Sequence, residues 1–140
     1  MADPARRIVV GIDGSPSAER ALDWAIGEAQ RRAASLHLVA AWLYPMALGY
    51  AFTSTVADVR QSAQDDIDRA LAHIDEVAPG IAAGGETVEQ QPAPALVAAA
   101  EGADLLVVGS RGRGGFQGLL LGSVSQYCTR HATCSVVVVR

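Results

Sequence analysis

Residues 7–16 read RIVVGIDGSP, and this short stretch decides the fold. The apolar run at 7–12 predicts a buried strand, because a strand that is covered on both faces need not alternate between apolar and polar residues. The turn signal at 13–16 ends that strand. Ser15 or Ser17 is then expected to cap a helix, whose apolar residues recur at spacings of three and four.

The same alternation of strand and helix continues along the chain. The expected elements are strands at 36–41, 87–91, 105–108 and 136–139, helices at 56–77, 94–101 and 123–131, an irregular stretch at 43–55 and a linker at 80–86. This order predicts an α/β fold with an open five-stranded parallel sheet and helices on both faces. We expect residues 1–140 to form one domain. A ligand would then lie beyond the carboxyl ends of the strands, where the strand order reverses.

The composition excludes several kinds of chemistry. The chain of 140 residues contains 26 alanines and no lysine, so Schiff bases, a phosphate-loop lysine and a lysine general base are ruled out. The net charge of −4 argues against DNA binding. The two cysteines, Cys128 and Cys134, are expected to be small buried thiols. With neither an export signal nor a membrane span in the sequence, we expect a cytoplasmic protein.

The helix expected at 56–77 has one strongly charged side. Its charged residues are Asp58, Arg60, Asp65, Asp66, Asp68 and Arg69. The aspartates are spaced so that they point in different directions around the helix. We therefore expect a solvated face and not a metal site.

Glycine is concentrated after the fourth expected strand, where residues 109–123 read GSRGRGGFQGLLLGS and hold six of the 14 glycines. Glycines allow the backbone to adopt φ > 0 and to press its N–H groups against an anion. Gly122-Ser123 then opens a helix, whose free N–H groups favour a phosphate. Arg111 and Arg113 either add contacts to phosphate oxygens or point to solvent. The dinucleotide fingerprint fails, because Gln117 stands where its third glycine belongs.

The spacing Gly109-x2-Gly112-x9-Gly122-Ser123 resembles the pattern G-2x-G-9x-G-(S/T) of the ATP-binding branch of the universal stress protein family. The first strand and its turn at 10–15, the second strand at 36–41 and the last strand at 134–139 are similar to those of the family as well. The likeness extends over residues 6–140. It implies a Rossmann-like nucleotide-binding α/β fold.

The resemblance also implies roles for individual residues. Gly109, Gly112, Gly122 and Ser123 would contact phosphates and ribose, together with the backbone N–H of Val124; Ser110 belongs to the same loop. Asp13 would lie against the ribose and phosphates, although its turn sequence equally predicts a helix-capping role. Ala41 would read the adenine edge through its backbone. Gly11 would allow the nucleotide to approach closely, and Mg²⁺ would be held mainly by the phosphates.

These features favour an ATP-binding, cytoplasmic regulator of the stress response, with no catalytic residue and no protein-held metal. The alternatives are a slow ATP hydrolase, in which Asp13 orients water or metal, and an interaction module that binds AMP or a cyclic nucleotide. The four valines at 136–139 predict either an interior strand or an edge. The family resemblance favours a homodimer through this strand. Gly122→Val and Gly109→Ala are expected to abolish ATP binding and to leave the fold intact.

Overall fold

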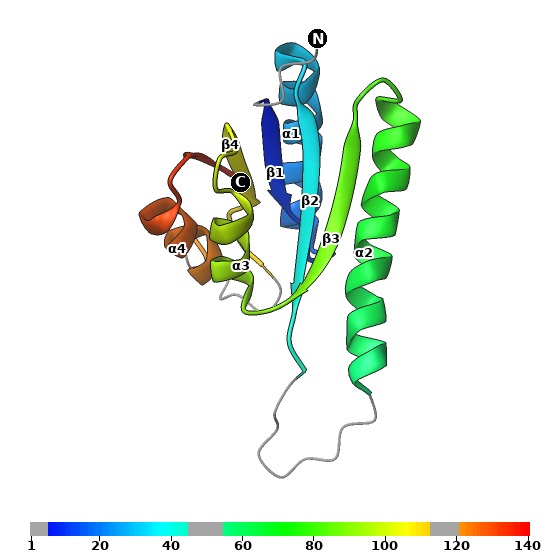
Figure 1. Ribbon diagram of the computed structural model, residues 1–140, viewed down its shortest axis with the longest axis vertical. Helices are drawn as coiled ribbons and strands as arrows, with labels where there is room; N and C mark the ends of the chain where they lie inside the picture. Colours follow the sequence, from blue (N-terminus) through cyan, green and yellow to red (C-terminus); the bar gives the residue numbers. More distant parts are fainter. Residues whose placement is uncertain (1–5, 45–54, 113–120) are drawn as a thin grey trace.

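The strands pair in the order β3-β2-β1-β4-β5, and every pairing is parallel (Figure 1). The computed structural model describes residues 6–44, 55–112 and 121–140. The strands are β1 (Arg7–Gly11), β2 (Ser35–Trp42), β3 (Ala83–Glu89), β4 (Leu105–Gly109) and β5 (Ser135–Val139). The helices are α1 (Pro16–Arg32), α2 (Val56–Val77), α3 (Pro92–Ala99) and α4 (Ser123–His131). The predicted open, parallel α/β fold is confirmed.

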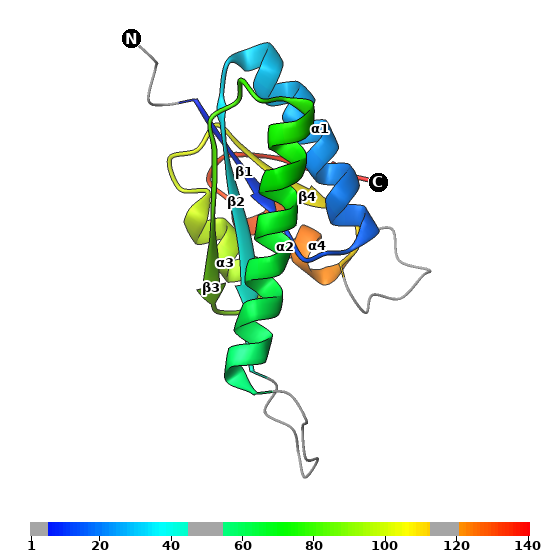
Figure 2. The same ribbon diagram turned by 90° about the vertical axis from the view of Figure 1, so that its right-hand side faces the viewer.

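Helices cover both faces of the sheet, as Figures 1 and 2 show from two sides. Helices α1 and α2 pack on one face, and α3 and α4 pack on the other. Strand β1 lies between these layers, with Ile8 and Val10 in the α1/α2 core and Val9 in the α3/α4 core. All three side chains are fully buried. The three central residues of the strand are therefore all apolar.

The strand order reverses at β1. The chain runs from β1 outward through β2 to β3, and then returns to the other side of β1 to form β4 and β5. In such sheets the two chain directions leave a crevice at the carboxyl ends of the central strands. The segments that follow β1 and β4 therefore meet at the same edge of the sheet.

Ser15 is the N-cap of α1, which decides between the two predicted caps. Its Oγ accepts a hydrogen bond from the N–H of Ala18 at 3.2 Å. Helix α2 begins with a capping box, in which Thr55 and Asp58 each accept a hydrogen bond from the backbone N–H of the other. Such caps satisfy N–H groups that a helix leaves without an internal partner.

Three details differ from the sequence prediction. Strand β3 begins at Ala83 and not at Thr87, so part of the expected 80–86 linker is strand. Tertiary packing overrides the low strand propensity there: a Cβ on Gly85 would lie 2.8 Å from Ile67 Cγ2 of α2. Helix α3 begins at Pro92, two residues before the predicted start.

Asp66 is the third difference, because it does not belong to the solvated face of α2. Its side chain is 7% exposed and forms an ion pair with Arg69 one turn further on. A buried carboxylate needs such a partner to offset its desolvation.

Within the described ranges, no helix has both the length and the apolar character needed to cross a membrane. Strand β5 lies at the edge of the sheet.

Candidate nucleotide site

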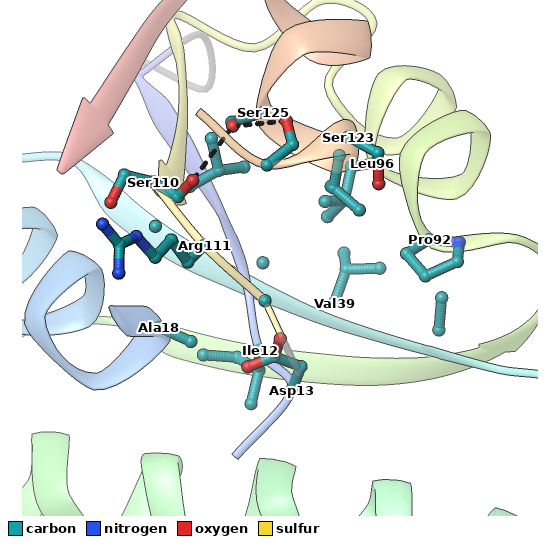
Figure 3. Close-up of a pocket in the computed structure, with 17 residues that line it drawn as sticks. Ile12, Asp13, Ala18, Val39, Pro92, Leu96, Ser110, Arg111, Ser123 and Ser125 are labelled. Carbon is teal, nitrogen blue, oxygen red and sulfur yellow. Dashed lines mark hydrogen bonds between the residues drawn. The ribbon is translucent and has the colours of Figure 1, made fainter. Parts of the chain in front are cut away.

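A cavity of about 280 Å³ opens at the carboxyl ends of β1 and β4 (Figure 3). Ten of the eleven residues selected from the sequence line it: Gly11, Asp13, Ala41, Gly109, Ser110, Arg111, Gly112, Gly122, Ser123 and Val124. The eleventh, Arg113, lies outside the described residues. The structure therefore brings residues from four separate segments to one place.

One wall of the cavity is apolar, and sequence reasoning missed it. Val39 of β2, Val108 of β4 and Leu96 of α3 belong to the buried α3/α4 core and also line the cavity, and Pro92 of α3 completes the wall. Leu96 packs closely on β1, since a Cβ on Gly11 would lie 3.0 Å from Leu96 Cδ1. The apolar residues at the i and i+4 positions of α3 were the signal that could have identified this wall.

The direction of the Ala41 backbone follows from the pairing of β2. In a parallel sheet, the N–H and C=O of one residue point to the same neighbouring strand, and this side alternates along the strand. Val39 C=O accepts the N–H of Ile12, at 2.9 Å, on the β1 side. Two residues on, Ala41 therefore directs its N–H and C=O to the same side. The last β1–β2 pair is Gly11↔Val39, so β1 has ended before it reaches the level of Ala41. No residue of β1 is therefore paired with Ala41.

Asp13 has a structural role in addition to its place in the cavity wall. Its Oδ1 accepts hydrogen bonds from the backbone N–H, at 2.9 Å, and from the hydroxyl of Ser15. These bonds hold the turn that leads into α1, while the residue that caps the helix is Ser15. The other oxygen, Oδ2, would lie 3.2 Å from a Cβ on Gly112, across the cavity mouth. One carboxylate thus orders the turn and also faces the glycine segment.

The described glycines of the motif are needed for space and not for unusual backbone angles. Among the described residues, only Gly14 and Gly102 are glycines with positive φ. At Gly109 an added Cβ would lie 2.4 Å from Ser17 Oγ and 2.8 Å from the Ser17 carbonyl atoms. At Gly122 it would lie 3.3 Å from Ser110 O. An alanine side chain at Gly109 would therefore meet α1 before any ligand, so we expect Gly109→Ala to lower stability in addition to any effect on binding.

The amino end of α4 borders the cavity. Its N-cap is Gly122, and no side chain caps the helix. The backbone N–H groups of Ser123 and Val124 are therefore in the first turn, where an α-helix leaves its donors without internal partners. Arg111 is exposed, and Figure 3 shows its side chain extending away from Pro92. The anion-attracting feature of this wall is the backbone of α4.

A second hollow, of about 320 Å³, lies between α1 and α2. Ile12 and Ala18 line both this hollow and the cavity at the carboxyl ends of β1 and β4. Little more than one layer of side chains therefore separates the two hollows. The second hollow holds the ion pair of Arg69 with Asp66, and His73 Nε2 lies 2.8 Å from Asp23 Oδ1 at its rim. In the described parts of the chain, no three His, Cys, Asp or Glu side chains gather in a way that suits a metal ion.

Neither cysteine lines the cavity at the carboxyl ends of β1 and β4. Cys128 is fully buried in the α3/α4 core, and this burial raises the pKa of its thiol to about 11. Cys134 is half-buried, and burial raises the pKa of its thiol as well. Thiolates are the reactive form of cysteine, so burial lowers the reactivity of both thiols.

The sequence model of the Universal stress protein family matches residues 4–140. The chain belongs to this family. A universal stress protein of Mycobacterium tuberculosis is 39% identical over 136 residues, which cover 95% of this chain and 45% of that relative. One from Mycolicibacterium smegmatis is 37% identical over 143 residues, with 95% and 45% covered. The chain thus spans about half the length of the curated relatives that it matches.

Solved structures of the same family have the same fold. A universal stress protein family member from Burkholderia pseudomallei is 28% identical, with a TM-score of 0.75 over 99% of this chain and 98% of that chain. A universal stress protein solved in complex with cAMP is 32% identical, with a TM-score of 0.70 over 96% and 97% of the two chains.

Proposed function

We propose that this universal stress protein binds adenine nucleotides, ATP among them, in the cavity at the carboxyl ends of β1 and β4, and acts as a nucleotide-dependent regulator. One observation carries the proposal: ten residues chosen from the sequence for nucleotide binding line a single cavity. The cAMP complex of a family member 32% identical to this chain supports it. Pockets for small molecules combine an apolar wall with a few placed polar groups, and this cavity has both.

The two ends of the cavity suit the two ends of a nucleotide. The base packs against Val39 and Leu96, and its edge hydrogen-bonds with the N–H and C=O of Ala41. A purine needs both a donor and an acceptor for such recognition, and a backbone supplies them whatever the side chain. The phosphates lie at the uncapped amino end of α4, where the N–H groups of Ser123 and Val124 bind them.

Asp13 is the only carboxylate among the described residues that line the cavity. Mg²⁺ is commonly held by one or two carboxylates together with substrate phosphates. A magnesium ion that arrives with ATP therefore fits this site, with Asp13 Oδ2 as the protein's oxygen and the phosphates as the main ligands. The ion would neutralise phosphate charge. Asp13 itself keeps the turn into α1 in place through Ser15.

A slow ATP hydrolase is the second candidate, and the position of Asp13 Oδ2 opposite Gly112 favours it. In that reading, the carboxylate orients a water molecule toward the terminal phosphate. Release of inorganic phosphate by the purified protein separates the two functions. Hydrolysis requires that the wild-type rate exceed those of Asp13→Asn and Gly122→Val. Equal release by all three excludes it.

We further propose a cytoplasmic homodimer that forms through β5. The supporting observation is that β5 is an edge strand whose Val136 to Val139 side chains are only half-buried. An edge of this kind is an aggregation hazard unless another chain covers it. Sedimentation equilibrium tests the dimer directly, and a monomer mass at all concentrations excludes it.

Mass spectrometry of the nucleotide that co-purifies with the native protein, followed by calorimetric titration with ATP, AMP and cAMP, tests the binding proposal. Gly122→Val places a branched side chain against Ser110 O, where a Cβ alone already lies 3.3 Å away. We expect it to weaken binding at least tenfold. Gly84→Val is the matched control, since nothing lies within 4 Å of its Cβ. Equal affinity of both variants, with equal thermal stability, contradicts the site.

A further inference from the structure

The two ends of the glycine-rich segment are tied together at one point. Ser110 C=O accepts the N–H of Gly122 at 2.6 Å and the hydroxyl of Ser125 at 3.4 Å. Ser125 Oγ also lies 3.0 Å from Gly122 O (Figure 3). The N–H of Ser110 donates to Val139 O, at 2.8 Å, at the end of β5. These bonds fix Ser110 and hold the carbonyl end of the peptide group that joins it to Arg111. The N–H end of that group is held by another residue.

That residue is Ser17, the second residue of α1. Its Oγ accepts the N–H of Arg111 at 3.2 Å. Ser17 is 5% exposed and is not among the described residues that line the cavity. Its hydroxyl occupies the space that the missing side chain of Gly109 leaves, since a Cβ there would lie 2.4 Å from Oγ. Gly109 and Ser17 therefore form a matched pair, in which the glycine admits the hydroxyl.

The Ser17 bond is the second of two bonds that together hold one peptide group in the site. The carbonyl of that group, Ser110 C=O, points to Gly122, and its N–H, on Arg111, points to Ser17. With both ends fixed, the direction of the following N–H, on Gly112, is restricted. Backbone donors that are held in advance toward an anion avoid the cost of ordering them when it binds.

We propose that Ser17 is a positioning residue of the nucleotide site, which holds the Arg111 peptide so that Gly112 presents its backbone to the phosphates. This inference rests on the proposed nucleotide binding. Ser17 acts on the phosphate end of the ligand only. The base end is formed by Val39, Leu96 and the Ala41 backbone, and none of these contacts involves the Ser17–Arg111 bond.

The test compares AMP with adenosine, which lacks the phosphate, on wild type, Ser17→Ala and Ser17→Thr. We expect Ser17→Ala to weaken AMP binding by about 3- to 10-fold, the loss that one neutral hydrogen bond predicts. Adenosine affinity should stay the same, and Ser17→Thr, which keeps the hydroxyl, should restore AMP binding. Thr129→Ala is the matched control, because it removes a helix hydroxyl bonded to a backbone carbonyl, 2.8 Å away, outside the cavity.

Amide hydrogen exchange gives a second readout that does not depend on any ligand. The Arg111 amide should exchange faster in Ser17→Ala, while the amides of β1 and β4 keep their protection. Unchanged AMP affinity in Ser17→Ala, or an equal loss for AMP and adenosine, overturns the positioning role alone. If the wild-type protein binds none of the nucleotides, the proposed function fails, and this inference fails with it.

Discussion

Substitution of Gly109 by alanine tests why the motif contains glycine at this position. The new Cβ would lie 2.8 Å from the carbonyl carbon and oxygen of Ser17, whereas ordinary contacts begin at 3.4 Å. The amino end of α1 and β4 must therefore separate by about 0.6 Å, the difference between 3.4 and 2.8 Å. Overpacking of this kind costs about 1–3 kcal/mol. The conflict involves backbone atoms, so no change of rotamer relieves it.

Equilibrium unfolding in urea measures this cost, with Gly84→Ala as the matched control. Gly84 also lies in a strand, and nothing is within 4 Å of its Cβ. Because alanine reduces the freedom of the unfolded chain, the control should be as stable as wild type or more stable by up to about 1 kcal/mol. We expect Gly109→Ala to lose about 1–3 kcal/mol with an unchanged dependence on urea.

A double variant separates the side chain of Ser17 from its backbone. Ser17→Gly removes the hydroxyl, which would be 2.4 Å from the new Cβ, but leaves the carbonyl atoms at 2.8 Å. Combining it with Gly109→Ala should therefore recover only part of the lost stability. The reasoning is refuted if Gly109→Ala and Gly84→Ala unfold at the same urea concentration, because the packing conflict would then have no energetic effect.

Two further predictions concern stability. Burial raises the pKa of Cys128 from 9.0 to about 11. The folded state therefore holds this proton more tightly than the unfolded state does. As a result, we expect the free energy of unfolding to fall by about 2–3 kcal/mol as the pH rises from 9 to 11. Urea unfolding of wild type against Cys128→Ala isolates the effect, because the two proteins differ only at this thiol. Parallel pH profiles would contradict it. Gly14 has a φ of 76°, in the left-handed region that favours glycine. We expect Gly14→Ala to lower the free energy of unfolding in urea by about 1–2 kcal/mol, and Gly14→Asn to lower it by less. If both variants are as stable as wild type, the turn relaxes at no cost and the prediction is contradicted.

The sequence predicted the fold class well because burial on both faces leaves a clear trace in each central strand. The boundary of β3 was missed because Gly84 and Gly85 have low strand propensity, and only the packing of Gly85 against Ile67 shows why glycine is there. Asp66 was assigned to solvent by its charge. Its burial depends on how α2 lies on the sheet, and that cannot be deduced from spacing alone.

The candidate site divides in the same way. The glycine segment was found because its composition after a buried strand is a local signal. The roles of Gly11, Asp13 and Ala41 came from the family resemblance. Pro92 and Leu96 of α3 and the hydroxyl of Ser17 were missed. Their roles arise where segments distant in the sequence meet, and Ser17 had a competing local explanation as a helix cap.

The composition of the cavity wall determines which experiments can detect it. Six of the 17 lining residues carry either no side chain or a single methyl group: Gly11, Ala18, Ala41, Gly109, Gly112 and Gly122. An alanine scan leaves Ala18 and Ala41 unchanged, and at the four glycines it adds a methyl group where elsewhere it removes side-chain atoms. A scan that skips the alanines, or that counts the glycines as truncations, would thus report on the method and not on the site. Replacing single amides by esters, or adding atoms at the glycines, probes the main chain itself.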